Sequence, residues 1–228
     1  MARLPRLVVP GQAHYLILRA HDSVAAQGIC ADATDRETLM GALREAAAAE
    51  GVRVHAYSVL PAELHLLATP EQPLGLGRFV QALGRRYVTA YNRKRQRAGT
   101  LWEGRFRCAV VEPGPNRLAV MLLIDGISTE PDCSSASHRS GGLRETLLSD
   151  LPEIWQLGNT PFDREAAYRS RLEVGLSAET AGALRKSALG GWAIGSNAFI
   201  TSLATPSTRG SVRPASPRPR GRPRLKPG

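Results

Sequence analysis

The sequence predicts an α+β fold of the ferredoxin-like, split βαβ type, in which a four-stranded antiparallel sheet carries its helices on one face. Four short β-rich segments alternate with helical segments in the order β-α-β-β-α-β, and a further helix follows. A short Pro-Ala connection joins the two middle β segments, as is typical of antiparallel neighbours. The 228 residues are 43% hydrophobic, which is enough for one core of ordinary domain size.

The first strand and the first helix are predicted from the N-terminal third of this pattern. Residues 14–19 (HYLILR) form a β-rich run directly after a turn, and this run predicts the first strand. Thr34, with Glu37 three residues later, matches a capping box. We therefore expect an alanine-rich helix to begin at this point and to end near Gly51.

The remaining elements follow from three further patterns. Residues 52–60 alternate apolar and polar side chains and residues 64–69 form a second apolar run, so a β-hairpin is expected. Residues 76–95 carry apolar side chains at helical spacing, which predicts a long helix whose apolar stripe faces the sheet and whose arginines face outward. Residues 105–112 (RFRCAVVE) predict the fourth strand, and residues 116–127 predict a short apolar helix.

Four regions are expected along the chain. They are an α+β domain (1–130), a linker or loop (131–160), a helical appendage (161–203) and a disordered basic tail (204–228). The appendage carries two or three short helical patterns, which could pack on the open face of the sheet or on DNA. The tail is dominated by Pro, Gly, Ser and Arg, so it has too little apolar surface to fold.

Positive charge is concentrated in two stretches of the chain, whose net charge is +10. Residues 78–107 hold nine basic residues and one acidic residue, and residues 209–228 hold seven basic residues and no acidic one. These stretches together exceed the charge of the whole chain, so the rest is net acidic. This distribution predicts a polyanionic partner. Nucleic acid is favoured over an anionic membrane surface, because neither stretch has the bulky apolar face of an interfacial helix.

The composition argues against several other classes of protein. No run of about 18 apolar residues occurs, and the N-terminal residues lack the features of a secretory signal. We therefore expect no membrane association and a cytoplasmic, nucleoid-associated protein. Cys30, Cys108 and Cys133 have no C-x-x-C spacing, so three reduced thiols are expected rather than a disulfide framework or a zinc site.

Several blocks of sequence resemble one known family. The blocks are LPAELHLL (60–67), YVTAYNR (87–93), GTLWEGRF (99–106) and GGWAIGS (190–196), preceded by the N-terminal residues 1–11. In this order they resemble the REP-associated tyrosine transposases, which are HUH-type single-strand nucleases related to small insertion-sequence transposases. The resemblance spans roughly residues 1 to 200 of the chain.

The resemblance implies a metal site on the second strand of the hairpin. Members of this family hold one divalent metal with two histidines in His-x-His spacing, and residues i and i+2 of a strand point to the same face. The matching positions here are Glu63 and His65, which predicts a Mg²⁺ or Mn²⁺ site with one carboxylate ligand. Considered alone, His65 also fits a buried structural histidine, and Glu63 fits a charge that discourages edge pairing of strands.

The resemblance also implies a tyrosine nucleophile, which this sequence lacks at the matching position. Family members cut single-stranded DNA beside a hairpin by attack of a tyrosine hydroxyl on phosphorus. The position falls near Asn116 and Arg117, and no tyrosine occurs between Tyr91 and Tyr168. Tyr87 and Tyr91 are candidates for a substitute nucleophile, although their spacing of four on a helix favours a core stripe.

The sequence therefore supports a transposase-like DNA-binding protein that recognises hairpin or single-stranded DNA, as a monomer or homodimer, with impaired catalysis. The alternative is an active single-strand DNA transposase that uses a substitute tyrosine. An RNA-binding protein is a third hypothesis, which the aromatic content of 5% disfavours. The residues predicted to contact DNA are Arg85, Arg86, Arg93, Lys94, Arg95, Arg97, Arg105, Arg220, Arg222 and Arg224.

The last three of these arginines belong to a short motif in the tail. PRGRPR (219–224) resembles an AT-hook. Its Arg-Gly-Arg-Pro core fits the narrow minor groove of an A·T-rich duplex, because the glycine lets the backbone lie deep while the flanking arginines enter the negative groove. An A·T-rich duplex is therefore a further candidate partner.

Overall fold

The computed structural model describes residues 6–128, 130–142, 144–203 and 216. Its sheet contains the strands β1 (His14–Arg19), β2 (Val52–Val59), β3 (Glu63–Pro70) and β4 (Arg107–Val110). The strands lie in the spatial order β2-β3-β1-β4, and all neighbours are antiparallel. This order is that of the split βαβ arrangement, so the predicted fold class is confirmed.

The described helices follow in chain order. They are α1 (Asp22–Ala25), α2 (Ala33–Ala49), α3 (Gly75–Lys94), α4 (Pro115–Gly126), the 3₁₀ helix η1 (Pro131–Cys133), α5 (Ala136–Arg139), α6 (Pro152–Trp155), α7 (Pro161–Val174), α8 (Ala178–Gly190) and α9 (Asn197–Ser202). No described helix is long and apolar enough to cross a lipid bilayer.

The start of α2 differs from the prediction. Its N-cap is Asp32, whose side chain accepts a hydrogen bond of 2.9 Å from the backbone N–H of Asp35. The predicted capping box of Thr34 and Glu37 is therefore wrong, and Thr34 lies inside the first turn. Asp is a preferred N-cap residue, and the Asp35 carboxylate in turn accepts a hydrogen bond from the backbone N–H of Ala31. Lys94 of α3 also contacts the Asp32 carboxylate.

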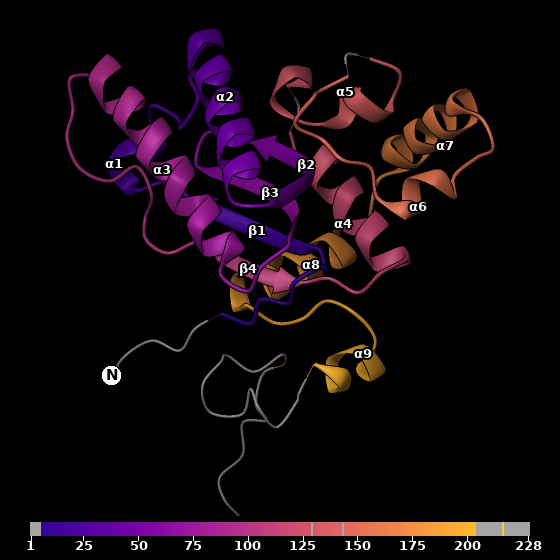
Figure 1. Cartoon of the computed structure of the whole chain (residues 1–228). Helices are drawn as coiled ribbons and strands as arrows, with labels where there is room; N and C mark the ends of the chain where they lie inside the picture. The colour runs from indigo at the N-terminus through magenta and orange to yellow at the C-terminus, as the bar shows by residue number, and fades with distance from the viewer. Residues whose placement is uncertain (1–5, 129, 143, 204–215, 217–228) are drawn as a thin grey trace, which may run out of the picture.

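Helices cover both faces of the sheet (Figure 1). On one face, α2 and α3 pack over Leu16, Leu18 and Leu66 and contribute Leu43 and Phe79 to the core. This is the pair of helices that the split βαβ arrangement places on one side of the sheet. The strands point alternate side chains to opposite faces, so the residues between these leucines lie on the other face.

The second face is covered by α4 and α8, which contribute to a separate core, and α7 packs against α4, α5 and α6. Tyr15, Ile17 and Leu67 of the sheet share this core with Leu184 of α8 and with Tyr168 of α7. The sequence left open whether residues 161–203 pack on the sheet or on DNA, and the structure places α8 on the sheet and α7 against α4. The division of the chain into a domain, a linker and an appendage stays a prediction.

Irregular segments line both edges of the sheet. Beside β2, the backbone N–H of Ser135 donates to Tyr57 and that of Ser149 donates to Val54. These two serines belong to residues 131–160, predicted as a linker or loop, which contain η1, α5 and α6. Beside β4, Ile194 bridges Val111 and exchanges backbone hydrogen bonds with the end of the strand.

Candidate functional site

Glu63 and His65 lie at the start of β3, on the face of the sheet that α8 covers. His65 is fully buried and Glu63 is 8% exposed. Their side chains point to the same face, as positions i and i+2 of a strand do, and His65 Nε2 lies 2.9 Å from Glu63 Oε2. The two residues of the predicted metal site therefore contact each other directly.

The tautomer of His65 follows from its two partners. The Tyr15 hydroxyl lies 2.7 Å from His65 Nδ1 on the side opposite Glu63. Burial raises the pKa of Tyr15, so its hydroxyl keeps its proton and can donate it to Nδ1. Because an ionised carboxylate only accepts hydrogen bonds, the His65 proton at Nε2 is donated to Glu63.

Arg185 of α8 completes this cluster. Its Nη2 lies 2.8 Å from Glu63 Oε1 and 2.7 Å from Glu63 Oε2, and its Nη1 lies 3.4 Å from His65 Nε2. Arg19 of β1, the cross-strand neighbour of Glu63, places its Nε 3.5 Å from Glu63 Oε1. Burial alone raises the pKa of Glu63, but the hydrogen bonds from His65 and Arg185 lower it overall, so this carboxylate is ionised at neutral pH.

These residues do not fit the predicted Mg²⁺ or Mn²⁺ ion. Both Glu63 oxygens contact a guanidinium, and the His65 nitrogen that faces Glu63 carries a proton. A divalent cation requires ligand atoms that are deprotonated and not already occupied by a cationic side chain. The described residues contain no group of three or more His, Cys, Asp or Glu side chains that could hold a metal ion.

The position predicted for the nucleophile lies at the start of α4. Asn116 Nδ2 donates to Glu112 at 3.0 Å, and the buried Arg117 donates from Nη2 to Gln12 at 2.7 Å. Arg117 Nη1 also lies 3.7 Å from Glu153. Neither side chain can attack phosphorus as a tyrosine hydroxyl does, and both make contacts that hold the start of α4 in place.

Tyr87 and Tyr91 lie in the core beneath α3, and each is 1% exposed. Tyr87 donates its hydroxyl to the carbonyl of Ile29 at 2.5 Å, and Tyr91 donates to the carbonyl of Gly28 at 2.9 Å. Burial raises the pKa of Tyr87, which keeps its hydroxyl protonated. In this conformation neither hydroxyl is accessible to a DNA phosphate.

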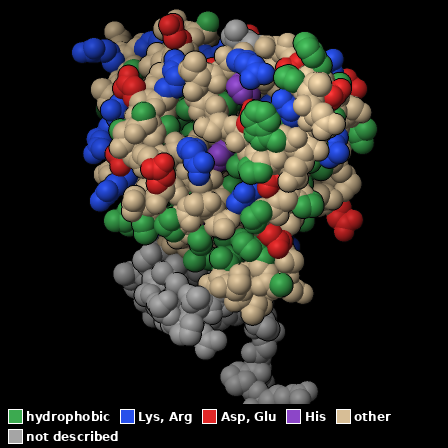
Figure 2. All heavy atoms as spheres, turned by 45° about the vertical axis from the view of Figure 1, so that its right-hand side comes forward, with side chains coloured by type: hydrophobic (Ala, Val, Ile, Leu, Met, Phe, Trp, Pro, Cys, Tyr) green, Lys and Arg blue, Asp and Glu red, His purple; other side chains and the backbone are tan. Residues whose placement is uncertain are grey.

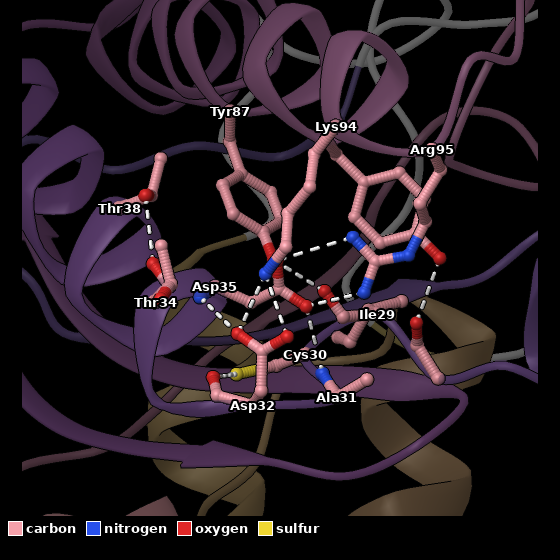
Figure 3. A network of polar contacts seen from close by, with 12 residues as sticks. Ile29, Cys30, Ala31, Asp32, Thr34, Asp35, Thr38, Tyr87, Lys94 and Arg95 are labelled. Carbon is pink, nitrogen blue, oxygen red and sulfur yellow. Dashed lines mark hydrogen bonds and ion pairs between the residues drawn. The ribbon is translucent and has the colours of Figure 1, made fainter.

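Two of the predicted DNA-contacting residues take part in a network at the end of α3 (Figure 3). Lys94 Nζ lies 2.6 Å from Asp32 and 3.0 Å from Asp35, and Arg95 donates to the carboxylate of Asp35. Burial raises the pKa of Asp35, but the hydrogen bonds from Arg95, Ala31 and Lys94 outweigh it and lower this pKa overall. These cations hold α3 against the start of α2.

The other basic residues predicted on α3 and after it have different surroundings. Arg86 pairs with Glu45 at 2.8 Å, and Arg97 donates to Asn92 at 2.8 Å. Arg85 and Arg93 are exposed and form no ion pair with a described residue. Arg105 is exposed as well, whereas Arg220, Arg222 and Arg224 lie outside the described residues. On the face shown in Figure 2, Lys and Arg side chains are interspersed with Asp and Glu.

A cavity of about 110 Å³ lies between β1, β4 and the loop before β4. It is lined by Ile17, Arg19, Glu103, Gly104, Arg105 and Arg107. Three guanidinium groups and one carboxylate give this cavity, which we call the arginine cavity, a positive charge suited to an anion. Sequence reasoning missed Arg19, because only the pairing of β1 with β4 brings it beside the basic segment.

Comparisons with known proteins find similarity of fold. No family model and no curated protein matches the sequence. One similar solved structure is a REP-associated tyrosine transposase bound to a REP hairpin, with TM-score 0.44, 14% identity, and coverage of 54% of this chain and 70% of that chain. Another is a candidate transposase from Deinococcus radiodurans R1, with TM-score 0.37, 24% identity, and coverage of 50% of this chain and 88% of that chain.

Proposed function

We propose that this chain is a transposase-like DNA-binding protein that recognises hairpin or single-stranded DNA and does not cut it. The observation that carries the proposal is that the residues at the expected nucleophile and metal positions are held in contacts with other side chains. Where the sequence resemblance places a nucleophile, Asn116 and Arg117 make structural contacts. Where it places a metal, the carboxylate of Glu63 is neutralised by Arg185. A chain with these replacements keeps the fold and lacks the groups that strand transfer requires.

Affinity for DNA is supported by arginines at the surface of the fold. Arg85 and Arg93 on α3 are exposed, and the arginine cavity adds a second group of guanidiniums. Each contact between such a side chain and a phosphate releases counterions, which favours binding at low salt. The competing proposal of an active transposase gains no support from the geometry, because the hydroxyls of Tyr87 and Tyr91 are buried.

The first prediction concerns catalysis. The protein is incubated with a labelled hairpin oligonucleotide that has a single-stranded flank, in the presence of Mn²⁺, and the products are separated on a denaturing gel. We expect a mobility shift on a native gel but neither a cut strand nor a slower covalent adduct on the denaturing gel. An adduct that protease treatment removes would contradict the proposal, and heat-denatured protein serves as the control.

A second prediction concerns the DNA-binding face of α3. The double variant Arg85→Met with Arg93→Met should bind the hairpin more weakly. The slope of log K against log salt concentration should fall by about 1.5, since each lost phosphate contact removes roughly 0.7 to 0.9. Fluorescence anisotropy over a salt series measures both quantities. Arg171→Met, an exposed arginine of α7, is the matched control, and a double variant that behaves like it would place the DNA elsewhere.

A further inference from the structure

A chain of polar contacts runs from the interior of the sheet to the surface of α8. Tyr15 donates to His65, His65 donates to Glu63, and Glu63 accepts from Arg185. Tyr15 and His65 are fully buried, whereas the side chain of Arg185 is 36% exposed. The buried end is held by the sheet, so the chain fixes the orientation of a guanidinium that solvent can reach.

The contacts of Arg185 leave part of its guanidinium available. Both short contacts to Glu63 involve Nη2. Nη1 lies 3.4 Å from His65 Nε2, which carries a proton in the tautomer derived above and therefore cannot accept from it. The N–H groups on the outer side of this planar group can thus donate to another acceptor. Arginine suits phosphate in particular, because its donors lie in one plane at the spacing of two phosphate oxygens.

Arginines lie on both sides of Glu63. The carboxylate lies between two arginines, with Arg185 on one side and Arg19 at 3.5 Å on the other. Arg19 also lines the arginine cavity and pairs with Glu103 at 3.1 Å. Two guanidiniums and two carboxylates balance within this group, and the excess of positive charge beside it comes from Arg105 and Arg107 of the arginine cavity, which attracts an anion.

We propose that Arg185 binds a phosphate group of the DNA and that Glu63, His65 and Tyr15 act as positioning residues for it. The pair that the sequence resemblance assigns to a metal ion serves here to orient a guanidinium. DNA binding then requires no divalent cation. This inference rests on the proposed function, because it assigns the phosphate of that same DNA to a specific side chain.

The test compares four proteins by anisotropy with the labelled hairpin oligonucleotide, in EDTA and in Mg²⁺ at matched ionic strength. We expect the wild-type protein to bind at least as tightly in EDTA as in Mg²⁺, because Mg²⁺ also competes for the DNA phosphates. Arg185→Met should weaken binding roughly tenfold and lower the salt slope by about 0.7 to 0.9. Lys186→Met, which removes an exposed charge from the neighbouring position of α8, should have little effect.

Glu63→Gln separates positioning from simple electrostatics. The variant makes the protein more positive, so non-specific attraction alone would strengthen binding, whereas loss of the oriented guanidinium should weaken it severalfold. Thermal melting of each variant confirms that it is folded. Should Arg185→Met not fold, Glu63→Gln still decides between the two accounts, because it keeps the shape of the side chain.

The outcomes test the role of Arg185 separately from the proposed DNA binding. Equal behaviour of Arg185→Met and Lys186→Met, tighter binding by Glu63→Gln, or loss of wild-type binding in EDTA would each overturn the role of Arg185 and leave a DNA-binding protein. A wild-type protein that does not bind the hairpin in either buffer would overturn the proposed function, and the inference would fall with it.

Discussion

Replacing Arg139 with methionine should lower the free energy of unfolding by roughly 3 to 5 kcal/mol, the usual cost of leaving one partner of a buried ion pair uncompensated. Arg139 is 4% exposed, and its Nη1 lies 3.5 Å from Oδ2 of Asp125, which is 2% exposed. It also donates to the backbone carbonyl of His55 on β2. The substitution therefore leaves a carboxylate and a carbonyl in the core without their cationic partner.

The expected loss of stability is large because the carboxylate of Asp125 on α4 is contacted by residues of α5 and α7. Tyr168 of α7 donates to it at 2.5 Å, and Ser135, next to α5, donates as well. Burial raises the pKa of Asp125, and this cost outweighs the donors that stabilise the charge. Removal of Arg139 takes away the one cation among these contacts, so α4, α5 and α7 should loosen together.

Urea unfolding followed by circular dichroism measures this effect. Arg171→Met on the exposed face of α7 is the matched control and should change the free energy of unfolding by no more than about 0.5 kcal/mol. A loss in Arg139→Met that is no larger than in this control would show that the pair contributes little. Asp125→Asn, which keeps the shape of the side chain, tests the same network from the other side.

Acidification from pH 7 to pH 4 should also destabilise the protein strongly. His14 and His55 are both buried, and desolvation lowers the pKa of each from 6.5 to about 4. The neutral rings are held by hydrogen bonds, His14 to the carbonyl of Gln12 at 2.8 Å and His55 to the carbonyl of Ser149 at 2.7 Å. Folding therefore requires both rings to remain uncharged.

The direction follows from proton binding in the two states. Between about pH 6.5 and pH 4 the unfolded chain binds protons at these histidines and the folded chain does not. The stability is therefore intact above pH 6.5 and falls as the pH is lowered, by roughly 3 kcal/mol for each histidine by pH 4. Urea unfolding at a series of pH values measures the slope. His55→Gln should reduce that slope by about half, and a flat profile in the wild type would refute the assignment.

Much of the fold could be predicted because local patterns agree with it. The HYLILR run is strand β1 over the same residues that its composition indicates. Its side chains from His14 to Leu18 are buried on both faces, since the sheet is covered on both sides. The sequence did not specify the second layer of helices, because the helical pattern of α8 does not show the surface on which this helix packs.

The candidate site could be predicted only where its residues are neighbours in sequence. Glu63 and His65 stand two apart, so their common face follows from strand geometry. Arg185 lies 122 residues from Glu63, and no local pattern connects the two. The same limit applies to Arg95 and its partner Asp35, which are 60 residues apart. A basic run shows that charge is present, whereas only the fold shows which of its members are already paired.

The segments that line the two outer strands have a consequence for self-association. An open strand edge offers unpaired backbone groups to a second chain and so promotes dimers and aggregates. Here Ser135 and Ser149 occupy hydrogen-bonding groups of β2, and Ile194 occupies those at the end of β4. Continuous sheets across two copies are thereby disfavoured. Truncation before Ile194 should instead release the edge of β4 and yield a protein that aggregates through its strands.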